Sequence, residues 1–193
     1  MILSLIGMSN VGKSYWAKKL EVEQGFKRFC CDDLIAEELM RRLSDVNLQN
    51  IDACAAWLGN PDEFGYRERV AAYLDCEEYS LVRAMECCVQ ETPVVIDTTG
   101  SLVYLPDSIQ QKLAQHSTVV YLETTSQQII EMTEKFHTHP KPLVWGEHRS
   151  YPELLAWREK RYQALAQVTI PYDVSHDSDF TSEKFLYEIL QHK

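Results

Sequence analysis

Residues 7 to 14 read Gly-Met-Ser-Asn-Val-Gly-Lys-Ser, which is a complete G-x-x-x-x-G-K-S phosphate loop. The loop follows the short apolar segment Ile2–Ile6 and leads into Lys13–Gln24, a stretch without glycine or proline that ends at Gly25. A strand, a glycine-rich loop and a helix in this order surround an anion with backbone N–H groups and the positive end of the helix. The pattern therefore predicts a site for the phosphates of a nucleotide.

Each part of the loop has an expected role. Gly7 and Gly12 let the backbone curl around the anion. Lys13 is expected to reach the β- and γ-phosphates as a catalytic group, and the Ser14 hydroxyl is expected to bind Mg²⁺. The residues predicted to bind ATP here are Gly7, Ser9, Asn10, Val11, Gly12, Lys13, Ser14 and Tyr15.

Composition limits the kind of protein and its partners. A length of 193 residues suits one α/β domain that spans residues 1–193. The net charge of −10 argues against nucleic acid and against an anionic membrane surface as partners. The six cysteines have no disulfide or metal-binding spacing, and the apolar N-terminal run is too short for a signal peptide or a membrane span. We expect a cytoplasmic monomer that acts on a small-molecule substrate.

Strand and helix patterns alternate along the chain. The expected strands are Ile2–Ile6, Lys27–Cys30, Pro93–Asp97, Thr118–Leu122 and Val168–Val174. The expected helical segments are Lys13–Gln24, 34–90, Asp107–Gln115, Ser126–Phe136, Pro152–Ala166 and Ser182–Gln191. Apolar strands that alternate with helices predict a three-layer α/β/α fold with a five-stranded parallel sheet and a site at the carboxyl ends of the strands.

Two segments stand outside this alternation. Residues 34–90 are long enough for a helical substrate-binding insertion, which Gly59-Asn60-Pro61 interrupts near its middle. Residues 136–151 contain histidines, prolines and several cations, a composition typical of a loop. We predict that this loop is a lid, and that Lys141 within it folds over ATP and supplies positive charge.

Acidic residues follow two of the expected strands. Asp32 and Asp33 come after the second strand, where a carboxylate can orient an acceptor hydroxyl, take its proton, or hold Mg²⁺ through water. A helix N-cap would explain the same residues. Asp97 ends the third strand, the usual place of the acidic group that holds Mg²⁺ opposite a phosphate loop. Asp32 and Asp33 are thus the candidate catalytic bases, and Ser14, Asp32 and Asp97 are the candidate metal ligands.

Other residues suit the binding of an acceptor. The turn Thr98–Ser101 offers N–H groups and hydroxyls to a substrate anion, with Gly100 and Ser101 as the expected contacts. Arg158, on the helix after the lid, can reach a substrate carboxylate or phosphate. A surface salt bridge would explain Arg158 equally well.

In this order the motifs resemble the shikimate kinase family of small P-loop kinases. The matching segments are Ile6-Gly7-Met8 with the Gly-Lys-Ser loop, Phe29-x-x-x-Asp33, Lys141-Pro142-Leu143 and Arg158-x-x-x-Tyr162. The resemblance implies a P-loop kinase fold and an enzyme that transfers the γ-phosphoryl group of ATP, with Mg²⁺, to a hydroxyl of a compact, anionic metabolite. It further implies that Asp33 contacts this hydroxyl, that Arg158 contacts a substrate carboxylate, and that Lys141 stands for an arginine of the lid.

The chain departs from the family pattern on the acceptor side. Asp-x-Asp becomes Cys31-Asp32-Asp33, and Gly-Gly-Gly becomes Thr99-Gly100-Ser101. Phe-Arg-x-x-Glu has two partial matches: Tyr66-Arg67 keeps the arginine, and Tyr73-Leu74-Asp75-Cys76-Glu77 keeps the glutamate. We include Arg67 among the expected substrate contacts. An arginine displaced along the helix predicts an acceptor larger than, or different from, shikimate.

Two other functions stay open on the sequence alone. A GTPase-like switch would explain the loop and the Asp97-Thr98-Thr99-Gly100 segment, but the chain has no Asn-Lys-x-Asp guanine-reading motif. A nucleotide-binding regulatory protein, or a degenerate kinase, would bind ATP and Mg²⁺ without transferring a phosphoryl group, because its altered acceptor turn no longer supports the reaction.

Overall fold

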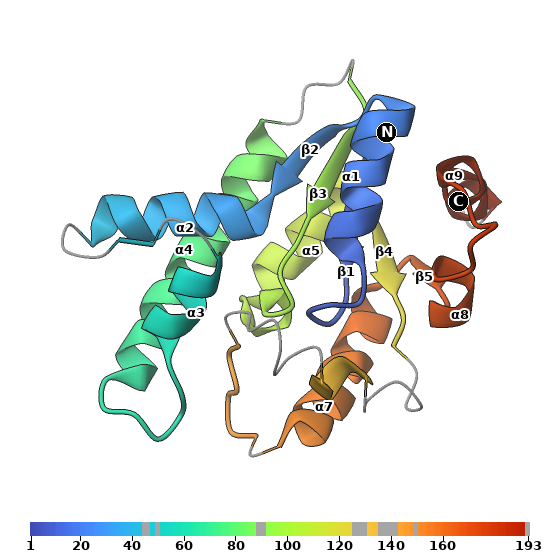
Figure 1. Cartoon of the computed structure of the whole chain (residues 1–193). Coiled ribbons are helices and arrows are strands. Elements are labelled where there is room, and N and C mark those ends of the chain that lie inside the picture. The colour runs from blue at the N-terminus through green and yellow to red at the C-terminus, as the bar shows by residue number, and fades with distance from the viewer. Residues whose placement is uncertain are drawn as a thin grey trace.

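Five parallel strands form the centre of the molecule, in the order β2-β3-β1-β4-β5 (Figure 1). The computed structural model describes residues 1–43, 47–48, 51–87, 92–124, 131–134, 143–148 and 150–191. The strands are β1 (Ile2–Ile6), β2 (Lys27–Cys30), β3 (Val94–Asp97), β4 (Thr118–Leu122) and β5 (Val168–Ile170). All four pairings between them are parallel. The predicted fold class is confirmed.

The order of the strands brings the sequence motifs to one edge of the sheet. Because β3 lies between β1 and β2, Asp97 is in register with Leu5 on one side and with Cys30 on the other. The carboxyl ends of parallel strands lie at the same edge, so the phosphate loop after β1, Asp97 and the residues after Cys30 converge there. This is the usual place of a ligand in an open α/β sheet.

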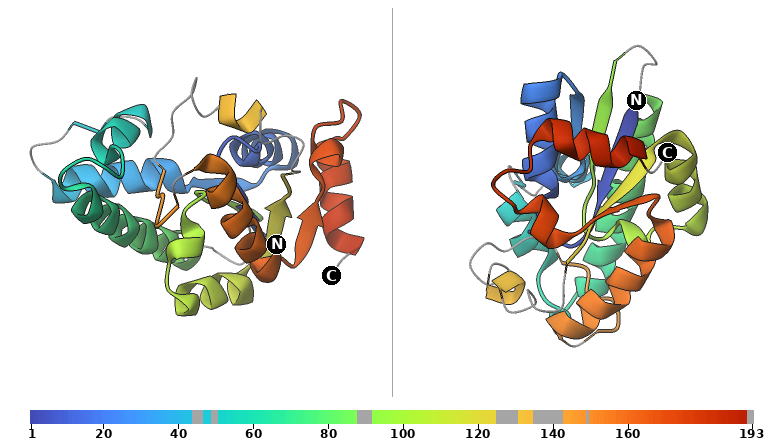
Figure 2. Two further views of the ribbon diagram at one scale, coloured as in Figure 1. Left: turned by 90° about the horizontal axis from the view of Figure 1, so that it is seen from below. Right: turned by 90° about the vertical axis from the view of Figure 1, so that its right-hand side faces the viewer.

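Helices cover both faces of the sheet. They are α1 (Lys13–Gln24), α2 (Cys31–Arg42), α3 (Ile51–Leu58), α4 (Tyr66–Glu86), the 3₁₀ turn η1 (Leu102–Tyr104), α5 (Asp107–His116), α7 (Tyr151–Leu165), α8 (Tyr172–Ser175) and α9 (Ser182–Gln191). Helices α1 and α9 lie on one side of the sheet, and α5 and α7 on the other (Figure 2). Helices α2, α3 and α4 extend past the β2 edge as an arm (Figure 1).

Several boundaries differ from those predicted. β5 ends at Ile170 instead of Val174, because Pro171 has no N–H for the sheet and α8 begins directly after it. The segment 34–90 contains three helices, and its break at Gly59 is confirmed, since this glycine has a left-handed φ of 72° after α3. Of the predicted helix Ser126–Phe136, only residues 131–134 are described, and they are helical.

Side-chain contacts fix the starts of the two longer helices near the C-terminus. Pro152 lies in the first turn of α7, where a proline is well tolerated, and Ser150 caps that helix by accepting a hydrogen bond from the Glu153 N–H. Ser182 is the first residue of α9, and its hydroxyl donates to Glu23 of α1 at 2.7 Å.

Two groups of buried side chains hold the fold together. The larger one packs around the sheet, and within it the Trp16 ring of α1 stacks on Phe185 of α9 with 4.7 Å between ring centroids. The smaller one fills the arm. Leu74, Tyr104 and Trp145 pack against both groups and so join the arm to the sheet.

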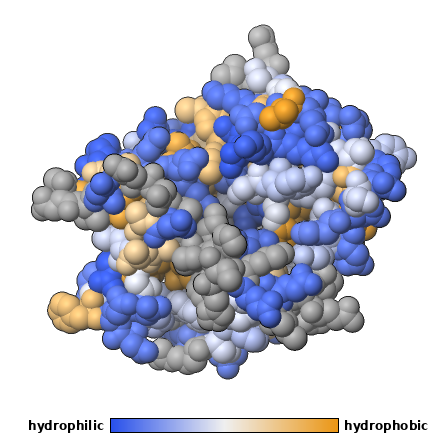
Figure 3. Space-filling view, in the orientation of Figure 1, coloured by the Kyte–Doolittle hydropathy of each residue, from blue (hydrophilic) through white to orange (hydrophobic). Residues whose placement is uncertain are grey.

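The face of the molecule that is seen in the orientation of Figure 1 is mainly polar. Figure 3 shows one face, on which hydrophilic side chains dominate and apolar ones form small, separate spots. Among the described residues, none of the helices combines the length and the apolar character that a membrane span needs.

We predict that Trp16→Ala lowers the free energy of unfolding by about 3–5 kcal/mol, because it removes a large buried ring and leaves a cavity between α1 and α9. Urea denaturation measures the loss. Val22→Ala on the same helix, where the side chain is 74% exposed, should change the free energy by less than about 0.5 kcal/mol. Equal losses in the two variants would contradict this account of the core.

Candidate active site

The phosphate loop has the backbone geometry that its glycines predict. Gly7 has a φ of +140°, and a Cβ atom there would lie 2.7 Å from the Leu122 carbonyl oxygen. Gly12 has a φ of +105° at the start of α1, and Asn10 between them has a positive φ of 67°. Such angles are rarely adopted by residues with a side chain, so the glycines at 7 and 12 set the curl of the loop.

The Lys13 side chain lies inside this curl. Its ammonium group donates hydrogen bonds to the carbonyl oxygens of Gly7 and Met8, both at 2.9 Å. Ser14 and Tyr15 are exposed on the first turn of α1. The predicted ATP-binding residues Gly7 and Ser9–Tyr15 therefore lie together, with a buried cation and an exposed hydroxyl at the positive end of a helix. Lys141, the remaining predicted ATP contact, lies outside the described residues.

A cavity of about 360 Å³ opens beside the phosphate loop. Its wall on one side is α1, and on the other the segment after β5, where the His176 ring stacks on Tyr172 with 3.6 Å between centroids. This volume falls in the range of small-ligand sites. Sequence reasoning missed this wall, because it ended the fifth strand at Val174 and gave no role to the residues that follow, Ser175 to Phe180. The lining residues are Gly12, Tyr15, Trp16, Lys19, Ser175, His176, Asp177, Ser178 and Phe180.

On the acceptor side, the hydroxyls of the turn after β3 point into the protein. Thr99 and Ser101 both donate to the carboxylate of Glu77 on α4, the Ser101 bond being 2.6 Å long. Thr98 donates to the Leu5 carbonyl oxygen at 2.6 Å. This corrects the expectation for Ser101, whose hydroxyl is already bonded to a buried carboxyl group instead of facing a substrate.

Gly100 lies where the phosphate loop, the turn and α7 meet. A Cβ atom at this position would be 3.1 Å from Nη1 of Arg158 and 3.1 Å from Oγ of Ser9, so there is little room for a side chain. The Tyr162 hydroxyl donates to the Gly100 carbonyl oxygen at 2.5 Å. The structure thus brings together Ser9, Gly100 and Arg158, which the sequence predicted separately.

Arg158 is buried, with 1% of its surface exposed. Its Nη2 donates to the Val144 carbonyl oxygen at 2.6 Å, and its guanidinium lies 5.2 Å from the centroid of the Tyr104 ring. Its Nε has no hydrogen-bond partner, and no carboxylate forms an ion pair with it, among the described residues. The surface salt bridge considered from the sequence is therefore wrong. A buried guanidinium of this kind suits an anionic group of a ligand.

Glu77, whose carboxylate accepts the hydrogen bonds of Thr99 and Ser101, is buried, with 2% of its surface exposed. Burial raises the pKa of its carboxyl group to about 7, against the opposing effects of the Ser101 and Thr99 hydrogen bonds and of the Arg158 charge. The sequence pointed to Glu77 only through its spacing from Tyr73, and we did not predict it as a site residue.

The two aspartates after β2 face different surroundings. Both lie in the first turn of α2, whose N-cap is Cys30, so the expected capping role belongs to neither. Asp32 is half-buried, and its charge raises the pKa values of Glu77 and Tyr73. Asp33 is exposed, and its charge acts on Arg28. The charge of Asp32 therefore acts on groups beside the acceptor turn, and the charge of Asp33 acts on the partner of Asp97.

Asp97 is buried in an ion pair that the sequence did not predict. Its Oδ2 accepts a hydrogen bond from Nη2 of Arg28 at 2.6 Å, while its Oδ1 has no partner among the described residues. Only the strand register could have indicated this ion pair. Arg28 lies beside Val95, and Val95 is two residues before Asp97, so its side chain is on the same face of the sheet.

The fit of this site to Mg²⁺ is partial. Mg²⁺ prefers oxygen ligands and keeps several waters, so the exposed Ser14 hydroxyl and the open Oδ1 of Asp97 suit it. The guanidinium of Arg28 opposes a cation there. No cluster of three or more His, Cys, Asp or Glu side chains arranged for a metal occurs within the described part of the chain.

The structure does not bring Arg67 to the acceptor turn. It is exposed at the start of α4, and no hydrogen bond or ion pair joins it to another described residue. The face of α4 that reaches the turn carries Tyr73 and Glu77, with Leu74 partly buried beside them. The displaced arginine thus points to solvent.

The described end of the predicted lid, residues 143–148, is tied to the helices around the site. The Tyr66 hydroxyl, on the first turn of α4, donates to the Leu143 carbonyl oxygen at 3.2 Å and accepts from the Trp145 N–H at 3.1 Å. Together with the Arg158 bond to Val144, these contacts link the lid segment to both α4 and α7.

We predict that Glu77→Gln changes how stability depends on pH. The pKa of Glu77 in the folded protein, about 7, lies above its ordinary value of 4.5. The stability that comes from its protonated form is therefore complete below pH 4.5 and is lost as the pH rises through 7. Over this range the free energy of unfolding of the wild type should fall, relative to the variant, by up to about 3 kcal/mol.

Urea denaturation at a series of pH values tests this prediction. Glu86→Gln, at an exposed position of the same helix, should show no such pH-dependent difference. A constant difference between the wild type and Glu77→Gln would mean that Glu77 is charged throughout this range.

Comparisons with known proteins agree with this geometry. The family model for shikimate kinase matches residues 71–192. A shikimate kinase of Francisella tularensis subsp. holarctica is 26% identical over 167 residues, which cover 86% of this chain and 82% of that relative. A shikimate kinase of Chromohalobacter salexigens is 29% identical over 144 residues, covering 72% of this chain and 73% of the relative.

A solved structure shares the fold. The shikimate kinase from Acinetobacter baumannii in complex with shikimate has a TM-score of 0.66 and 19% sequence identity, covering 100% of this chain and 94% of that chain. The segment matched by the family model is more than half of the chain, and it contains Glu77, Gly100 and Arg158. The chain belongs to the shikimate kinase family of small P-loop kinases, which are ATP-dependent phosphotransferases with an alcohol group as acceptor.

Proposed function

We propose that the acceptor of this kinase is a compact metabolite with one acid group, which Arg158 binds, and a hydroxyl, which Asp32 orients. The observation that carries the proposal is the buried guanidinium of Arg158, unpaired by any described carboxylate and next to Gly100 and the phosphate loop. A cation so placed costs desolvation energy that an anionic ligand offsets when it binds.

The nucleotide side uses the phosphate loop. Lys13 and the loop N–H groups bind the phosphates, and the cavity beside Gly12 takes the base. Ser14 and Asp97 would hold Mg²⁺, which would supply positive charge to neutralise the phosphates. Phosphoryl transfer needs little covalent help from the protein, so these residues act by positioning and charge.

Asp32 is the better candidate for the group that accepts the proton of the acceptor hydroxyl. Asp32 is half-buried within the electrostatic reach of Glu77 and Tyr73, which border the acceptor turn. Asp33, which the family resemblance favours, is exposed, and its charge acts on Arg28. A catalytic base must lie within reach of the proton that it removes, and the placement of Asp32 meets that condition better.

The altered turn and the residues of α4 favour the interpretation that the acceptor differs from shikimate. Leu74 stands where the family motif has an arginine, and Arg67 points away, so Arg158 binds the acid group without a second arginine of that motif. The Acinetobacter relative was solved with shikimate. We expect shikimate to be a poor acceptor here, compared with other hydroxylated carboxylic acids. The monomeric state, the cytoplasmic location and the lid role of Lys141 stay predictions.

The first test is an ATP-consumption screen of hydroxylated acids, shikimate included, with the purified protein. We expect at least one acid to be phosphorylated, and Lys13→Met to abolish the reaction because the charge that reaches the phosphates is lost. Binding of ATP and Mg²⁺ by calorimetry without transfer to any compound would favour the degenerate-kinase alternative. Tighter binding of GTP than of ATP would favour a GTPase-like switch.

The second test compares the two aspartates on the acceptor that the screen finds. Asp32→Asn should lower kcat by about 100-fold or more, because the proton of the hydroxyl loses its acceptor. Asp33→Asn, a matched change one residue away, should lower kcat by less than about 10-fold. The opposite ranking would assign the role to Asp33.

The third test addresses the acid group of the acceptor. Arg158→Lys should raise the KM of the acceptor by about 10- to 100-fold, since a point charge replaces a bidentate one, and should leave the KM of ATP within a factor of about three. Steady-state kinetics measure both constants, and thermal unfolding checks that the variant is folded. An unchanged KM of the acceptor would remove Arg158 from the acceptor site.

A further inference from the structure

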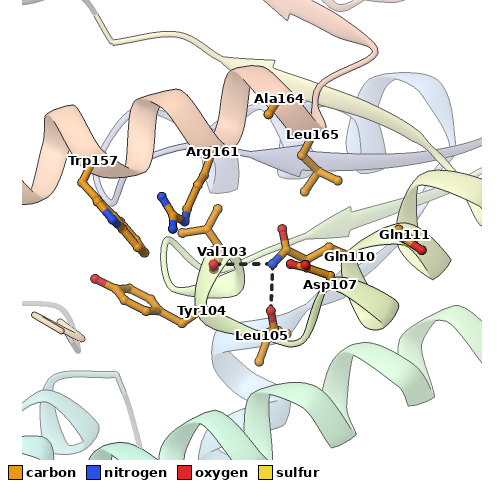
Figure 4. Close-up of a pocket in the computed structure, with 10 residues that line it drawn as sticks. All are labelled: Val103, Tyr104, Leu105, Asp107, Gln110, Gln111, Trp157, Arg161, Ala164 and Leu165. Carbon is orange, nitrogen blue, oxygen red and sulfur yellow. Dashed lines mark hydrogen bonds between the residues drawn. The ribbon is translucent and has the colours of Figure 1, made fainter.

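A second cavity, of about 480 Å³, lies between η1, the start of α5 and α7 (Figure 4). No residue that lines it also lines the cavity beside the phosphate loop. Its volume is within the range of sites that bind small organic molecules. Nothing in the phosphoryl transfer proposed above uses this cavity.

The cavity is bordered by two exposed charged groups that form no ion pair with a described residue. Arg161 extends from α7 toward the cavity, with its guanidinium 3.6 Å from the centroid of the Trp157 ring, and forms no ion pair within the described ranges. Asp107 lies on the first turn of α5, and its carboxylate likewise forms no ion pair there. The two opposite charges border one cavity without joining in a salt bridge.

The other residues that line the cavity indicate which further groups a ligand needs. Gln110 donates to the Leu105 carbonyl oxygen at 2.7 Å, which fixes its amide and leaves its side-chain oxygen as an acceptor (Figure 4). Val103, Leu105 and Leu165 supply apolar surface. A ligand that satisfies this lining has an acid group for Arg161, an apolar ring or short hydrocarbon, and a hydrogen-bond donor for Asp107 and Gln110.

We propose that this cavity binds a compact organic acid with an apolar ring and a hydroxyl or amino group at the far end from the acid. The carboxylate binds the guanidinium of Arg161, which the Trp157 ring holds in place, and the donor binds Asp107. The guanidinium is already positioned by its aromatic contact, so little conformational entropy is lost when the acid arrives.

The cavity adjoins the acceptor site through one aromatic side chain. Tyr104 stacks on Trp157 with 4.8 Å between centroids, and the Arg158 guanidinium lies 5.2 Å from the same Tyr104 ring. A ligand in the cavity therefore contacts the wall against which Arg158 packs. The binding site itself is separate from the acceptor turn, so its existence does not depend on the proposed reaction.

The probe for the test is 4-hydroxyphenylacetate, titrated into the purified protein by isothermal calorimetry. Two analogues dissect the contacts: 4-hydroxyphenylethanol lacks the carboxylate, and phenylacetate lacks the phenolic hydroxyl. We expect the probe to bind more tightly than either analogue. Arg161→Gln should weaken the probe at least about 10-fold, because a charge-assisted bond is lost. Asp107→Asn should weaken the probe but leave phenylacetate unchanged.

Lys160→Gln is the matched control, because it removes one positive charge from the neighbouring position of α7, where the side chain is exposed and outside the cavity lining. It should leave the affinity of the probe unchanged. The proposal is overturned if the probe gives no heat at millimolar concentration, if Arg161→Gln binds it as the wild type does, or if saturating ATP displaces it. Thermal unfolding of each variant excludes loss of folding as the cause of weaker binding.

Discussion

The carboxyl group of Glu77 connects the two halves of this protein. It lies on α4, in the helical arm, and accepts hydrogen bonds from Thr99 and Ser101 in the turn that follows β3 of the sheet. A buried acid of this kind must be satisfied, because an unpaired polar group in the interior costs as much as a lost hydrogen bond or more. The position of the acceptor turn relative to the arm therefore depends on this contact, and Tyr162 fixes the same turn from α7 through the Gly100 carbonyl oxygen.

This contact also relates two of the three departures from the family pattern on the acceptor side to each other. The family motif carries an arginine three residues before the glutamate, where this chain has Leu74, and it carries glycines where this chain has Thr99 and Ser101. The hydroxyls at 99 and 101 supply hydrogen bonds to a carboxyl group that lacks the neighbouring arginine. In this chain, two neutral hydrogen-bond donors, Thr99 and Ser101, thus take the place of the positive charge of the family's arginine next to Glu77. This is consistent with the raised pKa of Glu77.

The nucleotide side follows its local sequence closely. The glycines at 7 and 12, the buried Lys13 and the exposed Ser14 lie where the loop motif alone places them, because the curl of such a loop is set by its own backbone angles. The acceptor side has no such local rule. Its groups come from β3, α2, α4 and α7, which are far apart in the chain and meet only through packing.

The sequence by itself determined the phosphate loop, the parallel α/β fold, the strand positions within a few residues and the family, because each depends on short-range patterns of glycine, apolar and helix-forming residues. The tertiary structure decided the rest. The strand order β2-β3-β1 placed Arg28 against Asp97 and so occupied a carboxylate oxygen expected to bind metal. The start of α2 at Cys31 left Asp32 half-buried, with its charge acting on Glu77, and Asp33 exposed, with its charge acting on Arg28. Arg158 is buried, and is not part of a surface salt bridge, because α7 packs against η1. The burial of a side chain depends on the elements that cover it and not on the residues beside it in the chain.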